Sequence, residues 1–83
     1  MNLKLKYTNN GFPKITFKDR YNKPCAIQKS SLATEDAIWF GIDNGSDMMH
    51  LTTDQVEQLL PILQNFVETG ELTNDDGNWY EII

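Results

Sequence analysis

Apolar and polar residues alternate in the first part of the chain with the two-residue period of half-buried β-strands. Leu3, Leu5 and Tyr7 alternate with lysines, and Ile15 and Phe17 repeat the pattern one segment later. Side chains at every second position point to the same face of a strand. The sequence therefore predicts two strands, each with an apolar side and a lysine-rich side.

The loop between these two strands determines how they pair. A two-residue turn would place apolar side chains opposite polar ones on the same face. A three-residue loop over residues 9–11 instead pairs Leu5 with Ile15, so that the two apolar sides coincide. Because a one-residue slip moves every side chain to the other face, we expect the three-residue loop, with Gly11 in the left-handed conformation.

Three more segments are predicted to be strands: residues 25–27, 37–42 and 48–51. The middle one is continuously apolar, which is typical of a central strand that is buried on one face and at least partly covered on the other. Residues 43–47 have the composition of a hairpin loop. Residues 30–36 show neither period and have room for a single helical turn, capped by Ser30 or Ser31.

One long helix is predicted at residues 53–69. Its apolar side chains recur at intervals of three and four residues, which places them on one face: Val56, Leu59, Leu60, Leu63, Phe66 and Val67. Thr52 and Gln55 have the spacing of a capping box at the start. Gly70 stands where a left-handed residue commonly ends a helix. The segment therefore encodes its own start, end and buried face.

Pro61 interrupts this pattern in the middle of the helix. An interior proline removes one backbone donor and clashes with the preceding turn. Pro61 points away from the apolar face, so water can satisfy the freed carbonyl and the helix can bend around the core. We expect a kinked helix, and two short helices meeting at Leu60 and Pro61 are the alternative.

The last residues predict a turn at 74–77 and a strand or strand-like tail at 79–83. The whole chain then contains four to six short antiparallel strands and one helix. A sheet with one apolar face and a helix with one apolar stripe bury both surfaces by packing together. The sequence therefore predicts a two-layer α+β fold, with residues 1–83 forming a single domain and the kinked helix packed on one face of the sheet.

Charge is distributed unevenly along the chain. All seven basic residues lie in the first 29 positions, where Asp19 is the only acidic residue, so this segment carries a charge of +6. Residues 30–83 contain the other eleven acidic residues and no lysine or arginine. The net charge of −5 therefore hides two segments of opposite sign. Such asymmetry informs about partners and association rather than about fold.

The cellular compartment is predicted from sequence features that are rare or missing. Cys25 is its single cysteine, which cannot form an internal disulfide and suits a reducing environment. No apolar run approaches the roughly 20 residues of a membrane span, and the first residues lack the apolar core of a signal peptide. The sequence predicts a cytoplasmic protein that does not interact with a membrane.

No group of residues has the spacing of a catalytic or cofactor site. Cys25 belongs to an inward-facing series, which predicts a buried structural cysteine rather than a partner for His50. His50 has no second histidine or cysteine for a zinc site, and residues 43–47 lack the glutamate of a calcium loop. The neighbouring carboxylates Glu35 and Asp36 are typical of a solvated loop. We therefore expect a non-enzymatic protein without a cofactor or metal.

One helix covers only one face of a small sheet, so the other face is available for binding. Parity along the strands predicts that this face carries Lys4, Lys6, Lys14, Lys18 and Trp39, together with Thr16. Lysines around an aromatic ring suit a single-stranded nucleic acid, which they neutralise and stack upon. A structural explanation is also open, because edge lysines prevent aggregation and Trp39 could pack under Trp79 and Tyr80.

A second candidate surface, for binding a protein, follows the helix and its exit. Its residues, which we call the acidic ridge, are Glu57, Glu68, Glu71, Asp75 and Asp76. The ridge could engage the basic groove of a nucleic-acid-handling protein through fast, salt-sensitive association. It could also bind the basic face of a second copy, which would give a homodimer. A third explanation is that the charge keeps a small protein soluble.

Three stretches of the chain resemble a group of short phage and prophage proteins of unassigned function. They are IQKSSLATEDAIWFGID at residues 27–43, MHLT at 49–52 and QVEQLLPILQNFVETGEL at 55–72. The resemblance implies a bacterial host cell and a role in infection, where small acidic phage proteins often bind a host or defence protein. The leading hypothesis is therefore a phage-type protein that binds and modulates such a partner, for example as an inhibitor. Nucleic-acid binding and an accessory structural role are the alternatives.

Overall fold

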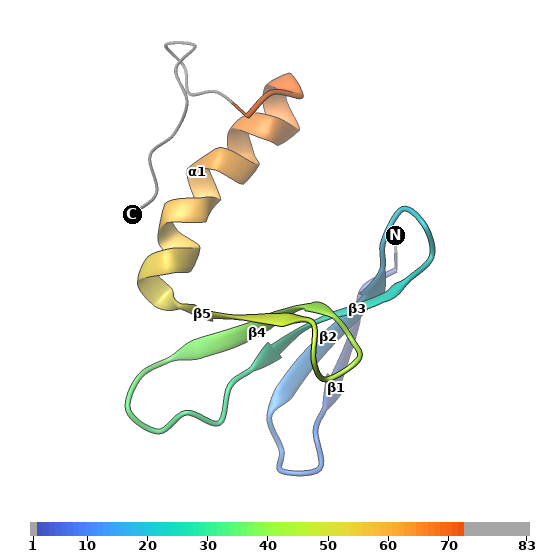
Figure 1. Cartoon of the computed structure of the whole chain (residues 1–83), viewed down its shortest axis with the longest axis vertical. Helices are drawn as coiled ribbons and strands as arrows, with labels where there is room; N and C mark the ends of the chain where they lie inside the picture. The colour runs from blue at the N-terminus through green and yellow to red at the C-terminus, as the bar shows by residue number, and fades with distance from the viewer. Residues whose placement is uncertain (1, 73–83) are drawn as a thin grey trace. The chain divides into compact units, whose positions relative to one another are not determined.

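The computed structural model describes residues 2–72 of the chain (Figure 1). The chain forms two compact units, Met1–Thr52 and Thr53–Ile83, which we call the sheet unit and the helix unit. The turn and strand predicted after residue 73, and the ridge residues Asp75 and Asp76, lie outside the described residues.

The sheet unit is a five-stranded antiparallel sheet in which each strand pairs with the next one along the chain (Figure 1). Its strands are β1 (Lys4–Tyr7), β2 (Pro13–Lys18), β3 (Pro24–Lys29), β4 (Ala37–Ile42) and β5 (Met48–Thr52). The order β1-β2-β3-β4-β5 makes β3 the central strand and leaves β1 and β5 at the edges. The continuously apolar β4 is paired on both sides, with β3 and with β5, and is therefore an interior strand as its composition predicts. The combination of this sheet with one helix confirms the α+β class.

The hairpin between β1 and β2 has the predicted three-residue loop. Leu5 pairs with Ile15, and Gly11 has a φ of 83°. The loop is closed by hydrogen bonds from the Gly11 amide to the Thr8 carbonyl at 2.8 Å and from the Phe12 amide to the Thr8 hydroxyl at 3.1 Å. A left-handed residue at the third loop position matches the twist of the two strands, and glycine adopts this conformation without a steric cost.

The turn between β2 and β3 and the loop between β3 and β4 are held by hydrogen bonds to side chains. The carboxylate of Asp19 accepts hydrogen bonds from the amides of Tyr21 and Lys23, at 2.8 and 2.9 Å, and so organises the turn before β3. Between β3 and β4, residues 30–36 contain no helical turn, so that prediction is wrong. The Ser30 hydroxyl there accepts from the Leu32 amide at 3.1 Å, which holds the loop in bends rather than in a helix.

Strand register divides the sheet into two chemically different faces. One face carries the apolar row Leu5, Ile15, Ile27, Phe40 and Met49, one residue from each strand. The opposite face carries the row Lys6, Lys14, Gln28, Trp39 and His50. Lys4, Thr16 and Lys18 lie on this second face by the same pairing. We call it the basic–aromatic face.

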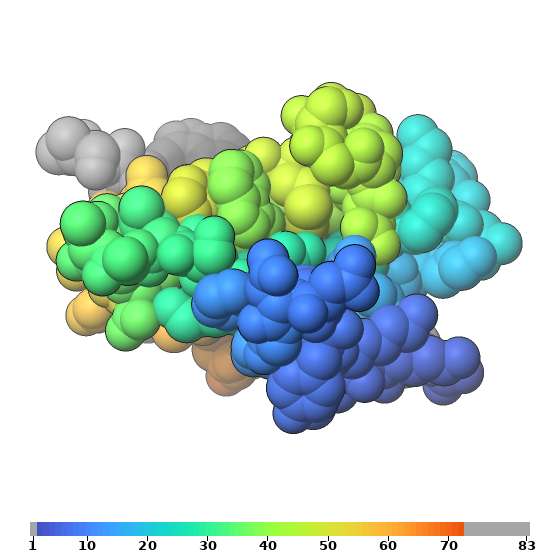
Figure 2. All heavy atoms as spheres, turned by 90° about the horizontal axis from the view of Figure 1, so that it is seen from below, coloured from blue at the N-terminus to red at the C-terminus, as the bar shows by residue number. Residues whose placement is uncertain are grey.

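Three small apolar residues of the sheet unit are buried: Cys25, Ala26 and Ala37. The burial of Cys25 confirms the prediction made from its strand position. Ala26 pairs with Gly41, and backbone atoms of Asp47 and Met48 in the β4–β5 hairpin lie close to Gly41. The loop of this hairpin stands out from the sheet unit as a compact knob (yellow-green in Figure 2).

The helix unit contains α1 (Thr53–Thr69), with the bounds that its sequence predicts. Pro61 lies inside this single helix, so the alternative of two short helices is wrong. The kink itself stays a prediction. The helix ends as expected, because the Gly70 amide donates to the Phe66 carbonyl at 2.7 Å and Gly70 has a φ of 78°.

Side-chain burial along α1 differs from the predicted pattern in two respects. Asn65 was predicted on the polar side but is buried, and its amide group donates to the Glu71 carbonyl at 3.4 Å. The chain turns back at Gly70, which brings this carbonyl within reach of the last helical turns. Four apolar residues are at least half exposed: Leu60, Leu63, Phe66 and Val67. The packing of the helix on the sheet therefore stays a prediction.

No helix among residues 2–72 has both the length and the apolar character that crossing a membrane requires.

Candidate functional site

The basic–aromatic face brings together the lysines and the tryptophan that strand parity predicted. Lys4 and Lys6 come from β1, and Lys14 and Lys18 from β2. Trp39 comes from β4 and is linked to the lysines by the row that runs through Gln28. Neighbouring strands are about 4.8 Å apart, so the row from β1 to β5 extends about 19 Å across the sheet. The face therefore offers positive charge at one end and aromatic surface at the other.

The aromatic end of the face is a stacked pair of rings. The centroids of Trp39 and His50 are 4.0 Å apart, and their planes differ by 9°. The Nε2 atom of His50 also lies 2.9 Å from the hydroxyl of Ser30, which is itself buried. The ring of His50 is therefore held from two sides, while its residue remains exposed on the edge strand β5.

The lysines of the face fall into two groups according to their ion pairs. Lys14 donates to the Asp43 carboxylate at 2.9 Å, and both side chains are less than a third exposed. Lys4, Lys6 and Lys18 form no ion pair with any carboxylate of residues 2–72. Three ammonium groups on one face are thus left available to an external anion.

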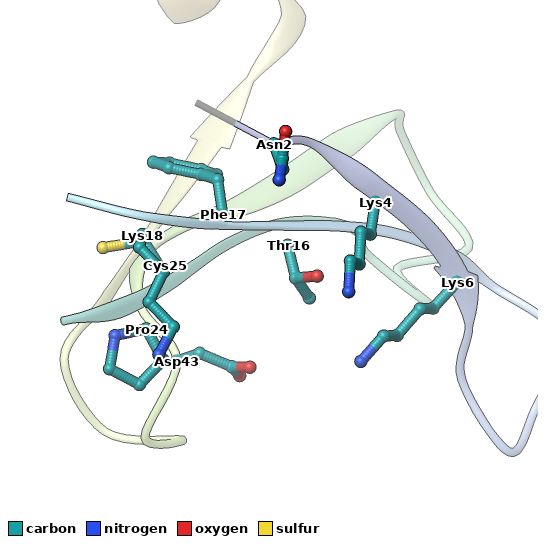
Figure 3. A pocket seen from close by; sticks show the side chains of 9 residues that line it. All are labelled: Asn2, Lys4, Lys6, Thr16, Phe17, Lys18, Pro24, Cys25 and Asp43. Atoms are coloured by element: carbon teal, nitrogen blue, oxygen red, sulfur yellow. The ribbon is translucent and has the colours of Figure 1, made fainter. Parts of the chain in front are cut away.

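A hollow of about 400 Å³ lies among these lysines. It is lined by Lys4, Lys6, Thr16, Lys18, Pro24 and Asp43, among others. Figure 3 shows the side chains of Lys4, Lys6 and Lys18 extending to the same side of the β2 ribbon as Asp43, whereas Phe17 points to the other side. The hollow can accept an anionic group between several cations, and Asp43 is the carboxylate that opposes this.

The charges of the two units differ in sign. The sheet unit contains all seven basic residues and five acidic ones, which gives a net charge of +2. Residues 53–83 contain the other seven acidic residues and no basic one, which gives −7. The net charge of the whole chain therefore does not describe the sheet unit, which is itself positive.

The acidic ridge is less concentrated than this face. Glu57 and Glu68 are exposed and share one side of α1, but eleven residues of helix separate them by about 16 Å. Glu71 follows the helix and is exposed. The Glu68 carboxylate accepts a hydrogen bond from Gln64 at 3.2 Å. Within the described residues, the ridge is a row of single charges rather than a cluster.

The other groups considered for chemistry are not brought together. Cys25 pairs with Ile42 on the apolar face and therefore lies on the opposite side of the sheet from His50. Residues 43–47 form a hairpin loop, in which the side chain of Asn44 accepts from the amides of Ser46 and Asp47 at 3.0 and 2.9 Å. In the part of the chain that the structure describes, no three His, Cys, Asp or Glu side chains are placed to hold a metal ion.

One of the two carboxylates of the β3–β4 loop, Asp36, forms an ion pair with Lys29. Asp36 accepts a hydrogen bond from the Lys29 ammonium at 2.9 Å. This hydrogen bond, together with the positive charge of Lys29, lowers the pKa of the Asp36 carboxyl below its usual value. Lys29 pairs with Ile38 and thus lies on the apolar side of the sheet, away from the lysines of the basic–aromatic face.

No family model, curated protein or solved structure matches this chain.

Proposed function

We propose that this protein binds single-stranded nucleic acid across its basic–aromatic face. The observation that carries the proposal is strand register, which places a stacked Trp39–His50 pair on the same surface as three lysines without an ion pair to residues 2–72. Neutralisation of phosphates by lysine supplies affinity without sequence preference. Stacking of bases on aromatic rings supplies affinity for the unpaired state, because bases in a duplex already stack on each other.

The dimensions of the face support a strand rather than a single small anion. The lysines occupy β1 and β2, whereas the stacked rings occupy β4 and β5. A single phosphate cannot reach both ends of a row about 19 Å long, but a backbone of several nucleotides can. Single-strand-binding folds use sites of about 4–16 nucleotides, of which this face matches the lower end.

The proposal is tested by titrating the protein into a labelled single-stranded oligonucleotide and following fluorescence anisotropy. Three phosphate contacts predict a slope of log K against log salt of about −2, hence about twentyfold weaker binding at 200 mM than at 50 mM salt. Trp39 fluorescence, isolated in a Trp79→Phe background, should be quenched on binding. Absence of binding at about 50 mM salt, where phosphate contacts are strongest, would contradict the proposal.

Removing the carboxylate of the hollow should strengthen binding. Asp43→Asn takes away one negative charge and releases Lys14 from its ion pair, so that a fourth lysine can meet a phosphate. We expect about fivefold tighter binding at 50 mM salt, measured by the same anisotropy titration. Glu35→Gln changes the net charge equally in an exposed loop, and it should leave the affinity nearly unchanged. Equal effects of the two substitutions would indicate a response to net charge alone.

The hypothesis of a protein partner for the acidic ridge remains a prediction. It expects a bacterial protein to be retained on the immobilised chain at low salt and released at high salt. Glu57→Gln and Glu68→Gln together should abolish such retention, since both carboxylates are exposed on one side of α1. Retention that survives this double substitution would exclude the helical part of the ridge as the binding surface.

A further inference from the structure

A second, smaller hollow lies on the basic–aromatic face beside Trp39. Its volume is about 230 Å³, and it is lined by Gln28, Trp39, Gly45, Ser46 and Met48. These residues come from three neighbouring strands and from the β4–β5 loop, which forms one wall. Pockets that bury a drug-sized ligand are larger, about 300–1,000 Å³, so this hollow suits a single ring system rather than a whole cofactor.

The position of Trp39 gives the hollow an aromatic wall. One face of the indole is occupied by the ring of His50, with which it is stacked. An incoming ring therefore has to use the remaining surface of the indole, where the hollow adjoins it. Offset stacking on an aromatic side chain is favourable for every nucleobase, because each base has a flat π face.

The polar groups around the hollow match the edge of a base. Gln28 is the Cα partner of Trp39 on the neighbouring strand, and both residues line the hollow. The side-chain amide of Gln28 offers one donor and one acceptor in the same plane, as the edges of nucleobases do. Met48 adds a polarisable thioether, which makes favourable contacts with aromatic rings. A flat ring with hydrogen-bonding groups on its edge is thus the chemistry that this hollow fits.

We propose that this hollow takes one unstacked nucleobase of the bound strand, which stacks on Trp39 and bonds with the amide of Gln28. This inference rests on the proposed nucleic-acid function and specifies where one base of the strand contacts the protein. The lysine-lined hollow on β1 and β2 then holds phosphate, while the hollow at the β4–β5 loop holds a base. The contribution of charge to the binding affinity thus comes from one site, and the contribution of base stacking comes from the other.

The test compares an intact pentathymidylate with a pentamer of the same backbone that carries no bases. The wild-type protein should bind the intact strand about tenfold more tightly, since stacking of one base is worth about this factor. Ser46→Leu places a branched, non-aromatic side chain at the mouth of the hollow without removing the backbone amide that bonds to Asn44. This substitution should weaken binding of the intact strand about tenfold and leave binding of the baseless strand unchanged.

Two further variants make the outcome specific. Ser31→Leu introduces the same change on an exposed loop that does not border the hollow, and should affect neither ligand. Gln28→Leu should weaken binding of the intact strand alone, because it removes the polar partner and keeps the volume of the side chain. Circular dichroism of each variant checks that the fold is retained.

Each result bears on one of the two proposals. Equal affinity of the wild-type protein for both pentamers would overturn the base site. Equal losses of affinity for both pentamers in Ser46→Leu would also overturn it. Either result would leave the proposed phosphate contacts of the lysines in place. Failure of the wild-type protein to bind either pentamer at about 50 mM salt would overturn nucleic-acid binding itself. A loss confined to the intact strand in Ser46→Leu and Gln28→Leu is the result that supports the base site.

Discussion

Replacing Lys4, Lys6 and Lys18 together by glutamine is expected to weaken binding of a single-stranded oligonucleotide about a hundredfold at 50 mM salt. These three lysines lie on the basic–aromatic face and form no ion pair with a carboxylate of residues 2–72. Each phosphate contact that is lost removes about 0.7 from the slope of log K against log salt, so the slope should fall by about 2. An anisotropy titration at several salt concentrations measures both quantities.

The chain supplies a matched control for this experiment. Arg20, Lys23 and Lys29 are three other basic residues, two in the β2–β3 turn and one paired with Ile38 on the apolar side. Their replacement by glutamine changes the net charge by the same amount. If binding uses the basic–aromatic face, this control set should reduce affinity only a fewfold through the long-range potential. Equal losses in the two sets would show that no particular face is used.

Local sequence patterns predicted those features of the fold that depend on neighbouring residues. The register of the first hairpin follows from alternation in two segments and from Gly11 between them, and the structure confirms it. The bounds of α1 follow from the residues at its two ends, which need no information about the rest of the chain. The prediction that Lys4 and Trp39 lie on the same face depends on the alternation in every strand between them. The strand register confirms this prediction.

Features that depend on contacts between strands were harder to predict. The alternation of apolar and polar residues does not predict that His50 stacks on Trp39. The Asn44–Gly45 dipeptide is a strong hairpin signal and, if taken as the two-residue centre of the turn, pairs Trp39 with His50. The sequence therefore contained the information for this contact. By contrast, the ion pair between Lys14 and Asp43 joins residues 29 positions apart and depends on strand order, which alternation does not encode.

Burial near the end of α1 illustrates the same limit. Helical periodicity placed Asn65 on the polar side, because asparagine is mostly exposed in proteins. In the structure Asn65 is buried, and its amide group donates to the carbonyl of Glu71. A buried polar side chain is favourable when its hydrogen bonds are satisfied, and here the partner comes from chain that follows the helix. The spacing of apolar residues within the helix gives no indication of such a partner.

Gly41 is the position at which a single methyl group is expected to destabilise the sheet unit most clearly. A Cβ atom at this position would lie 2.7 Å from the Asp47 carbonyl oxygen and 3.1 Å from the Met48 Cα atom, both of which belong to backbone. Backbone cannot rotate away as the tip of a side chain can, so the β4–β5 hairpin would have to open. Its loop provides Gly45 and Ser46 to the proposed base site, so that the same substitution should also weaken nucleic-acid binding.

We expect Gly41→Ala to lower the free energy of unfolding by about 3 kcal/mol, because overpacking adds to the cost of a φ of 153°. For a chain of this length, such a loss lowers Tm by more than about 10 °C, measurable by thermal unfolding followed with circular dichroism. Gly11→Ala is the control. Gly11 also has a positive φ, but a Cβ atom there would meet nothing within 4 Å.

The Gly11→Ala variant should therefore lose only the cost of a left-handed alanine, about 1 kcal/mol. Both variants place an alanine at a positive φ, so the difference between them reports the clash together with the difference in backbone strain between φ values of 153° and 83°. If Gly11→Ala were as destabilising as Gly41→Ala, close approach of the β4–β5 loop would not be the cause. The β4–β5 loop, which lines the proposed base site, approaches Gly41 closely through the backbone of Asp47 and Met48. Gly41→Ala should therefore lower both the free energy of unfolding and the affinity for the intact strand.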